Sequence, residues 1–503
     1  MSRITRVMPG MAISVLMALV LALCVPVSVF GDPVPRNRLM PESYVYNHVG
    51  GGFFYPFPAP LPYRFSHSMY AHDIGVDSFM HLGEVEYHDG RFFITNGNTL
   101  IVTDDELRAI TVLEGIYVDG QWENFSPLDG IFITATGDIL VAEPDAGRVI
   151  HLDENLDLVR VLGRPEGMGT DETGTYRPRK VAADSHGRIY VIAEGVFEGI
   201  VEINPDGSFN RFFGVVDVHP TAWELFRRRF QTNAQRIRTR VWLPNNFSNI
   251  AIDPAGFVFA TLSDPGSDVS VKKLNFQGEN ILRRPHTNHF VGDMEFNNIG
   301  IGIPQGPSII SIVQVTDFGV YYVFDNNRNR IFAYDQDGHN LFAFGGTGTR
   351  EGTMLTVTGM TMAGNRLVFA DRGNRSIEIF ERTEYGDMVL AAADRQFRHD
   401  YMGAAYYWGE VIRLNPFFNY AHVGVGISLY RQGYYEESMI YFQRGQDVSF
   451  FSMAYQRVRA GAMYRHFNTI MTIVTIVIVI YILQKIIRRV MARPRQKQRS
   501  GAA

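Results

Sequence analysis

Short apolar strands separated by polar turns repeat through the middle of the chain. Each of six segments contains a short apolar strand, a turn, a second strand rich in valine, isoleucine or tyrosine, a polar hairpin, and a third strand that ends at an acidic or amide residue. The copies cover residues 83–113, 130–163, 180–214, 249–282, 313–346 and 359–390. The residues that close the third strands are Asp104, Asp153, Asn204, Asn275, Asp335 and Glu381. Four short strands per unit, recurring about every 40–50 residues, are typical of propeller blades.

The sequence therefore predicts a mainly β protein in which residues 74–395 form a six-bladed β-propeller. A β-sandwich also has short strands, but it does not contain six copies of one unit in register. Two intervals between copies are long, because residues 215–244 and 284–308 are inserted between the last strand of one blade and the first strand of the next. Such connections emerge on the face that also displays the hairpin between the two middle strands, so both inserts are expected on that face.

From residue 396 to residue 466 the apolar positions follow the period of amphipathic helices. Helices are predicted near residues 402–414, 419–431, 435–446 and 451–466. Small and large residues at the expected helix crossings resemble the tetratricopeptide (TPR) pattern; they are Gly426, Leu429, Gly433, Tyr435 and Phe442. Only about one full repeat with half a repeat on each side is present. So short an array is expected to pack on the propeller, on its membrane anchor or on a partner.

The N-terminal end predicts export. Residues 1–31 have a basic start, an apolar middle and a small residue before a polar one, which is typical of a secretory signal peptide cleaved after Gly31. An uncleaved N-terminal anchor is the alternative, because the apolar stretch is long. Residues 32–73 form an extension rich in proline and aromatic residues. Its segment from Tyr44 to Tyr70 is expected to run over the propeller and help to close its ring, with sugar stacking as the alternative.

The C-terminal end predicts a single transmembrane helix at residues 467–487. An apolar run from Ile470 to Leu483 reaches the length of a span if Gln484 and Lys485 extend toward the lipid boundary. Seven cations and no acid follow the start of this run, most of them in the tail at residues 488–503. Because cationic flanks stay in the cytoplasm, the expected location is the cell membrane, with the large N-terminal part outside and the tail inside.

Cysteine content and charge exclude some kinds of covalent cross-link, metal site and partner. Cys24 is the only cysteine, so no disulfide and no site of several thiolates can form within the chain. The net charge of the whole chain is −5. Residues 1–31 contribute two positive charges and residues 467–503 contribute seven, so residues 32–466 carry a net charge of −14. Nucleic acid is therefore not expected as a partner, because phosphate binding requires clustered cations.

The blade pattern resembles that of the NHL-repeat family of six-bladed propellers, most closely in IAIDPAGFVFAT (250–261) and DNNRNRIFAYDQDG (325–338). That family includes propellers that bind proteins, RNA or small ligands, and a few lyases and lactonases. The order of signal, propeller, TPR-like helices, span and basic tail is similar to a group of bacterial surface proteins found beside carbohydrate ABC transporters and sometimes labelled gluconolactonase-like. This resemblance implies a protein partner such as a transporter component, and a carbohydrate ligand.

Residues at the starts of the innermost strands converge on the propeller axis and are candidate binding residues. They are Asp129, Arg179, Lys180, Asn246, Ser308 and Thr358. A propeller lactonase would hold a divalent metal at such positions with Glu, Asn and Asp. Two of these six side chains are cations and only one is an acid, whereas hard cations need several oxygen ligands. The sequence therefore predicts no metal or other cofactor and assigns no catalytic residue.

The first insert offers a second candidate binding surface. Residues 223–240 are predicted to form a helix that contains Trp223, Arg227, Arg228 and Arg229. The arginines can grip an anionic ligand or the acidic rim of a partner. The alternative is an amphipathic helix that packs Trp223 on the propeller and leaves the arginines in solvent.

Two functions are consistent with these features. The first is a binding or scaffold protein without catalytic activity, tethered outside the membrane and linked to carbohydrate uptake. The alternative is a propeller-type surface hydrolase or lactonase that acts on a sugar derivative. The sequence contains no G-x-S-x-G, H-E-x-x-H or phosphate-loop motif, and this favours the first function.

Overall fold

The computed structural model describes residues 42–49, 53–168, 175–214, 247–263, 270–284, 291–293 and 307–491. The predicted signal peptide, the first insert, most of the second insert and most of the basic tail lie outside these residues.

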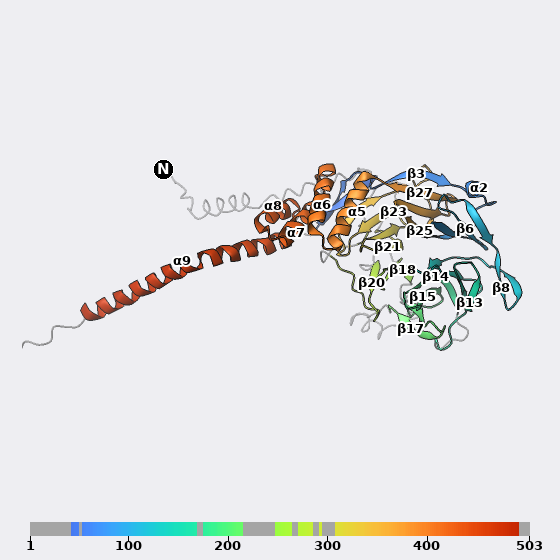
Figure 1. The fold of residues 1–503 in the computed structure, drawn as a ribbon, viewed down its shortest axis with the longest axis horizontal. Helices are drawn as coiled ribbons and strands as arrows, with labels where there is room; N and C mark the ends of the chain where they lie inside the picture. The colour runs from blue at the N-terminus through green and yellow to red at the C-terminus, as the bar shows by residue number, and fades with distance from the viewer. Residues whose placement is uncertain are drawn as a thin grey trace, which may run out of the picture. The chain divides into compact units, whose positions relative to one another are not determined.

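The described strands form six sheets and one separate hairpin (Figure 1). Blade 1 contains β4 (Leu82–His88), β5 (Arg91–Asn96), β6 (Thr99–Thr103) and β7 (Ala109–Leu113). Blade 2 contains β10 (Ile131–Ile133), β11 (Ile139–Glu143), β12 (Arg148–Leu152) and β13 (Leu158–Leu162). Blade 3 contains β14 (Arg177–Ala183), β15 (Ile189–Glu194), β16 (Ile200–Ile203) and β17 (Phe209–Phe213). The hairpin of β8 (Gly115–Val118) and β9 (Gln121–Asn124) lies between blades 1 and 2 in the chain.

The remaining blades depart from the four-strand plan. Blade 4 has three described strands, β18 (Phe247–Ile252), β19 (Val258–Leu262) and β20 (Val271–Leu274). Blade 5 contains β21 (Ile310–Val315), β22 (Tyr321–Asp325), β23 (Arg330–Tyr334) and β24 (Asn340–Phe344), and the N-terminal β1 (Ser43–Val49) and β2 (Phe53–Pro58) extend its outer edge. Blade 6 contains β25 (Val357–Ala363), β26 (Arg366–Asp371), β27 (Ser376–Arg382) and the N-terminal β3 (Tyr63–Met69). A short helix, α2 (Ala71–Ile74), follows β3.

The first strands of the blades contact one another in a closed ring. β4 contacts β10, and further contacts join β10 to β14, β14 to β18, β18 to β21, β21 to β25, and β25 back to β4. The prediction of a six-bladed β-propeller is therefore confirmed.

The recurring acidic or amide residue of the repeat forms the turn between the third and fourth strands. Asp153 Oδ1 accepts hydrogen bonds from the backbone N–H groups of Asn155 and Asp157, both at 2.9 Å. Asn275 accepts the equivalent pair in blade 4. Such a side-chain turn replaces the backbone bonds that a tight reversal leaves unmade. Glu381 is the exception, because it lies within β27, after which the chain does not form a fourth strand.

The N-terminal extension closes the ring, as predicted. β3 pairs antiparallel with β27 and supplies the fourth strand of blade 6 (Figure 1). The sixth repeat was predicted to reach residue 390, and this prediction is wrong. The strands of blade 6 end before α5, which begins at Glu384 and ends at Phe397. The hydroxyl of Thr383 accepts a hydrogen bond from the N–H of Gly386 at 3.2 Å, and this cap starts the helix.

Four further helices follow, and each packs on the one before it. They are α6 (Tyr401–Leu414), α7 (Asn419–Arg431), α8 (Tyr435–Arg444) and α9 (Val448–Met491). The first three match the predicted ranges within two residues. The expected pairing of small and large residues is present at Gly426, where an added Cβ would lie 2.6 Å from the ring of Phe442.

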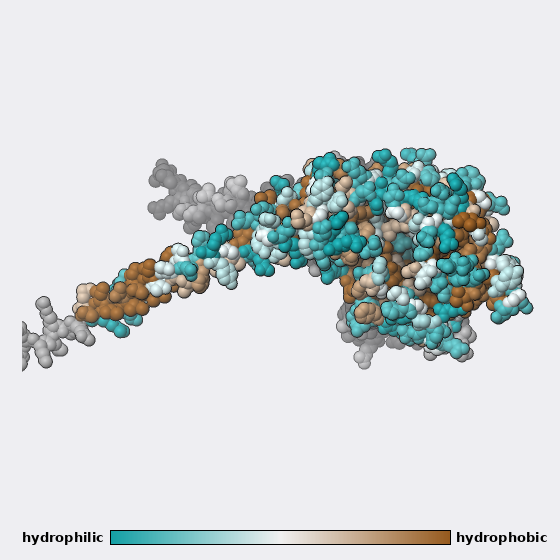
Figure 2. Space-filling model, in the orientation of Figure 1, coloured by the Kyte–Doolittle hydropathy of each residue, from teal (hydrophilic) through white to brown (hydrophobic). Residues whose placement is uncertain are grey.

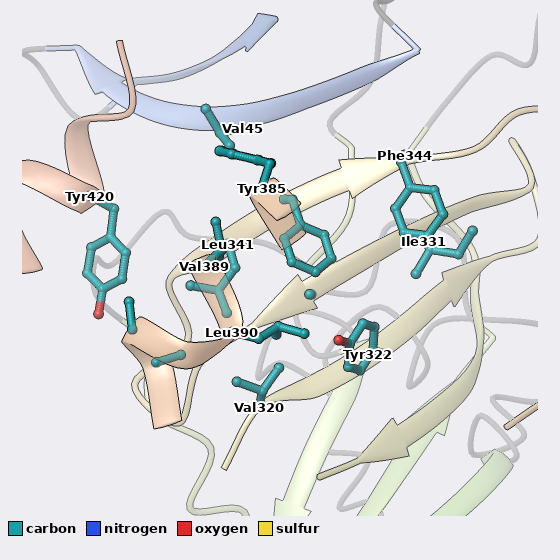
Figure 3. Close-up of a cluster of buried hydrophobic side chains, with 14 of the residues drawn as sticks. Val45, Val320, Tyr322, Ile331, Leu341, Phe344, Tyr385, Val389, Leu390 and Tyr420 are labelled. Carbon is teal, nitrogen blue, oxygen red and sulfur yellow. The ribbon is translucent and has the colours of Figure 1, made fainter. Parts of the chain in front are cut away.

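The helices share one hydrophobic core with blades 5 and 6. Leu341 and Phe344 of β24 are buried in the same cluster as Tyr385 and Val389 of α5 (Figure 3). Tyr420 of α7 belongs to this cluster, and its hydroxyl donates a hydrogen bond to the carboxylate of Asp335, which follows β23 in blade 5. The short helical array therefore packs on the propeller, one of the three arrangements that its length predicted.

The last helix continues without a break through the predicted span. α9 contains 44 residues, and an 18-residue window of it has a mean hydropathy of 2.5 with none of that window buried within the protein. Its apolar part is seen as a continuous brown surface in Figure 2. By length and composition α9 can cross a membrane.

Candidate functional site

The candidate site is a pocket at the propeller axis with a volume of about 360 Å³. Its described walls come from blades 2 to 6. Polar and charged side chains among them are Asp129, Arg179, Lys180, Glu194, Ser248, Ser311, Thr358 and Arg372, and Phe197 and Phe247 supply aromatic surface.

Irregular pairing at the start of the first strands of blades 3 to 6 places four of these side chains. In blade 3 the register between β14 and β15 shifts between Pro178 and Lys180, so that Arg179 has no partner residue in the ladder. The same shift occurs around Ser248 in β18, Ser311 in β21 and Thr358 in β25. A β-bulge turns the extra residue out of the regular alternation and is frequent beside binding sites. Here all four of these residues line the pocket.

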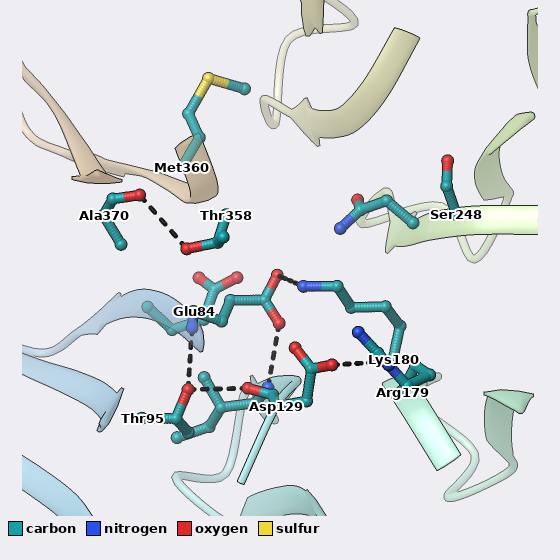
Figure 4. A network of polar contacts seen from close by, with 12 residues as sticks. Glu84, Thr95, Asp129, Arg179, Lys180, Ser248, Thr358, Met360 and Ala370 are labelled. Carbon is teal, nitrogen blue, oxygen red and sulfur yellow. Dashed lines mark hydrogen bonds and ion pairs between the residues drawn. The ribbon is translucent and has the colours of Figure 1, made fainter. Parts of the chain in front are cut away.

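Ion pairs link the charges of blades 2 and 3. Arg179 Nε lies 2.6 Å from Asp129 Oδ2 and its terminal nitrogen 3.5 Å from Glu194. The Arg179 side chain remains about half exposed, so this pair faces the open end of the pocket. Figure 4 shows Asp129, Arg179 and Lys180 close together, with Thr358 and Ser248 on the opposite side.

A second pair lies deeper, between Lys180 and Glu84. Lys180 Nζ is 3.0 Å from Glu84 Oε1, and both side chains are nearly buried. The other carboxylate oxygen of Glu84 accepts the N–H of Ile131 at 3.0 Å, and the backbone N–H of Glu84 donates to the hydroxyl of Thr95 at 2.8 Å. Burial raises the pKa of Glu84, although Lys180 acts in the opposite direction. These contacts tie blades 1, 2 and 3 together behind the pocket.

Glu86 lies two residues further along β4, on the same strand face. It accepts hydrogen bonds from Gln314 at 3.2 Å and from Thr361 at 3.2 Å, which come from β21 and β25. Burial and then the nearby charge of Glu84 raise the pKa of Glu86 to about 8. The side chain therefore keeps its proton at neutral pH.

Arg372 follows β26 and has fewer partners than the other cations of the pocket. Its Nε donates to the carbonyl oxygen of Leu82 at 2.8 Å. Within the described part of the chain Arg372 makes no ion pair, although it is half-buried. Burial and then the charge of Arg179 lower its pKa, while Asp129 acts in the opposite direction. A half-buried guanidinium without a carboxylate is costly unless an anion approaches it.

The structure brings together three of the predicted binding residues, Asp129, Arg179 and Lys180, along with Thr358. Ser308 does not line the pocket. Ser308 is buried, and its hydroxyl donates a hydrogen bond to Asp325 at 2.6 Å and accepts one from the N–H of Asp293 at 2.7 Å. Ser311 lines the pocket where Ser308 was expected.

The other predicted binding residues are not among those that the structure describes. These residues are Trp223, Arg227, Arg228, Arg229 and Asn246. The role of the arginine-rich insert stays a prediction.

Three functional candidates were missed by sequence reasoning: Glu84, Glu86 and Arg372. The count of a single axial acid is therefore wrong, because blade 1 adds two carboxyl groups at the axis. When the first strands are aligned on the bulges that the structure shows, Glu84 takes the position of Lys180, but the sequence alone does not mark these bulges. Arg372 follows the second strand of blade 6, in the hairpin that lies on the pocket face.

Among the described residues, no group of three or more histidine, cysteine, aspartate or glutamate side chains is arranged to hold a metal ion.

Comparison with known proteins gives similarities to solved structures alone. No model of a known protein family matches the chain, and no curated protein matches it in sequence. A streptogramin B lyase structure is 11% identical, with 63% of this chain and 97% of that one covered and a TM-score of 0.37. A virginiamycin B lyase from Staphylococcus aureus is 11% identical over 64% of this chain and 100% of that one, also with a TM-score of 0.37. A putative gluconolactonase is 13% identical over 65% and 94% of the two chains, with a TM-score of 0.37. Similarities this distant support no statement about activity.

Proposed function

We propose that this protein is a membrane-anchored binding protein whose axial pocket takes a small ligand that carries an anionic group. The observation that carries this proposal is Arg372, a half-buried guanidinium in the pocket that makes no ion pair within the described residues. Arg179 and Lys180 line the same pocket, and each is already held in place by a carboxylate. A carboxylate or phosphate bound to Arg372 in bidentate fashion would compensate its charge.

Binding fits the pocket better than catalysis. Among its described lining residues there is no histidine or cysteine, the side chains that most often act as a base or a nucleophile. Apart from Arg372, the charged side chains of the pocket are engaged in ion pairs, an arrangement that fixes their positions. Such fixed groups suit recognition of a ligand, and the hydrolase alternative has no comparable support.

The apolar α9 supports membrane anchoring, and the cations that follow it support a cytoplasmic tail with the propeller outside. In this arrangement the axial pocket would sample ligands outside the cell. A role beside a transporter component, and the engagement of a protein partner by the helices or by the arginine-rich insert, extend the same proposal.

Replacement of Arg372 tests the proposed pocket. The full-length protein in detergent is titrated with a panel of small carboxylates and phosphates, and the melting temperature and the heat of binding are measured. We expect at least one anion to stabilise the wild type, and R372Q to bind it about tenfold more weakly, the scale of one charge-assisted hydrogen bond. R350Q, which changes an exposed arginine outside the pocket, is the matched control. Equal binding by R372Q and R350Q would show that the anion binds elsewhere.

A further inference from the structure

The β8–β9 hairpin presents two aromatic side chains to solvent. Tyr117 and Trp122 are directly paired across the hairpin, with ring centroids 5.0 Å apart in an edge-to-face arrangement. Their exposed fractions are 66% and 50%, large values for such side chains. Trp122 Nε1 donates to Asn124 Oδ1 at 2.8 Å, which fixes the orientation of the indole. The pair is therefore a fixed apolar surface that no other part of the described chain covers.

Glycine at position 115 allows the indole to lie over its partner strand. A Cβ added to Gly115 would come within 2.9 Å of Trp122 Cζ2, and within 2.2 Å of the carbonyl oxygen of Glu123. A cavity of about 390 Å³ lies beside this aromatic pair and is also lined by Glu114 and Asp157. Two exposed carboxylates thus flank an aromatic platform.

This hairpin cavity is linked to the axial pocket by a third cavity. The middle cavity has a volume of about 720 Å³ and shares Val112 and Glu114 with the hairpin cavity. At its other side it shares Asp129 and Arg179 with the axial pocket. Three adjoining cavities therefore run from the propeller axis across blades 1 and 2 to the β8–β9 hairpin. We call this series the groove.

The middle of the groove offers both hydrogen-bond donors and acceptors. Its described polar residues include Asp77, Ser78, His81, Asn98, Thr99, Asp145 and Arg177. Arg177 and Asp145 form an ion pair at 2.5 Å, so their charges are balanced before a ligand arrives. A surface of this kind suits a ligand rich in hydroxyl groups, each of which both donates and accepts hydrogen bonds.

From these features we infer that the groove binds an oligosaccharide, with an acidic sugar unit at the axis and a further sugar ring stacked on the Tyr117–Trp122 pair. The inference rests on the proposed anion site and adds the class of ligand. The apolar face of a pyranose ring can lie flat on an exposed aromatic side chain, while its hydroxyls reach the neighbouring carboxylates Glu114 and Asp157. Arg372 and Arg179 then receive the carboxylate of the terminal unit.

A polypeptide fits the groove less well. An extended peptide binds through a free sheet edge together with pockets for alternate side chains. The groove is instead lined along much of its length by charged and amide groups, and its carboxylates would repel an acidic peptide. The net charge of −14 on residues 32–466 also disfavours a polyanion with many charges, so few acidic units are expected in the ligand.

The dependence of affinity on chain length tests the groove. The full-length protein in detergent is titrated with galacturonic acid and glucuronic acid, with oligosaccharides that carry either acid at one end of a neutral chain, with the neutral chains themselves, and with an acidic hexapeptide. We expect affinity to rise with chain length in the acid-terminated series and to be weaker for the neutral chains. W122A should lose about tenfold in affinity for the longer sugars and nothing for the single acids, since only the longer sugars reach the hairpin. F276A, which removes another exposed aromatic ring away from the groove, should bind as the wild type does.

The failure of the groove and that of the anion site give different results. If affinity does not depend on chain length and is unchanged in W122A, the proposal that the groove binds an oligosaccharide is wrong. Loss of binding of the single acids in R372Q would still support the axial anion site. Capture of the hexapeptide in a Trp122-dependent manner, without capture of any sugar, would replace the oligosaccharide by a peptide. If neutral chains bind as tightly as acid-terminated ones, the proposal that an acidic sugar unit binds at the axis is wrong. No binding of any acid or sugar would overturn both proposals.

Discussion

Two carboxyl groups of one strand meet different surroundings at the propeller axis. Glu84 has the ammonium group of Lys180 at 3.0 Å, whereas Glu86 accepts its hydrogen bonds from the neutral side chains of Gln314 and Thr361. Burial and then the nearby charge of Glu84 raise the pKa of Glu86, so the carboxyl group without a cation keeps its proton. The Glu84–Lys180 ion pair and the protonated Glu86 thus join blades 1, 3, 5 and 6.

Glu86 should make the stability of the protein depend on pH. Its pKa of about 8 in the folded protein lies above the value of about 4.5 for an unperturbed glutamate. The folded state therefore holds the proton more tightly, so its contribution to stability is complete below about pH 4.5 and is lost as the pH rises through 8. In E86Q this loss disappears, and relative to the wild type the variant should gain roughly 2 kcal/mol in free energy of unfolding between pH 5 and pH 9, less than the full shift implies because Glu86 is partly exposed.

Denaturant unfolding across that pH range measures the difference. E351Q, which changes an exposed carboxylate, should follow the wild type at every pH. Parallel curves for E86Q and the wild type would show that Glu86 titrates normally in the folded protein.

At the scale of elements, the blades combine a regular outer part with irregular inner edges. The turn between the third and fourth strands is built by one side chain and its neighbours, as at Asp153. In blades 3 to 6 the start of the first strand is shaped instead by a bulge, which turns Arg179, Ser248, Ser311 or Thr358 toward the axis. The same irregularity that interrupts the ladder therefore supplies the polar lining of the pocket.

Ring closure by β3 should control the stability of the whole propeller. Tyr63 is 3% exposed, stacks on Phe344 with centroids 5.3 Å apart, and its hydroxyl lies 3.0 Å from that of Tyr322. Y63A leaves a cavity between blades 5 and 6 and removes this hydrogen bond, so it should lower the free energy of unfolding by about 3–5 kcal/mol. Y70A changes a half-exposed tyrosine just after the same strand and should cost less than about 1 kcal/mol. Thermal unfolding followed by circular dichroism compares the two, and equal melting temperatures would show that blade 6 does not depend on β3.

Local patterns explain which parts of the fold were predictable. The repeat, its turns and the helices α6 to α8 arise from the periodicity of neighbouring residues, and each was predicted closely. The pairing of Tyr63 with Arg382 joins residues from opposite ends of the propeller, and no local pattern selects β3 over residues 384–390 as the fourth strand.

The axial site was likewise predicted only where a local sequence pattern marked its residues. Asp129, Arg179 and Lys180 were predicted because they stand at strand starts. The expected contribution of blade 5 was misplaced by three residues, since Ser311 lines the pocket where Ser308 was expected. Bulges set this register, and the sequence does not mark them. Glu84 and Glu86 were missed because the first repeat is the least regular of the six.

At the scale of the molecule, α9 joins the core to the predicted span. Ala454 of α9 is buried in the cluster that blades 5 and 6 share with the helices, so the first turns of α9 are part of the folded domain. A helix rises 1.5 Å per residue, so about 20 Å separate Ala454 from Phe467, where the predicted span begins. The helix is continuous over this stretch, so no loop separates the folded domain from the predicted span.

The distribution of cations around the span predicts its orientation. Seven cations follow the apolar run, whereas the 15 residues before it contain three arginines, at positions 457, 459 and 465. Translocating the more cationic flank is disfavoured, so the tail should stay in the cytoplasm and the propeller should face outward. In a background in which Cys24 is replaced by serine, S185C places a thiol on an exposed turn of blade 3, and S500C places one in the tail. A membrane-impermeant maleimide should label S185C in intact cells and S500C after permeabilisation only. Labelling of S500C alone in intact cells would reverse the orientation and would place the axial pocket on the cytoplasmic side, where its ligand would have to be sought.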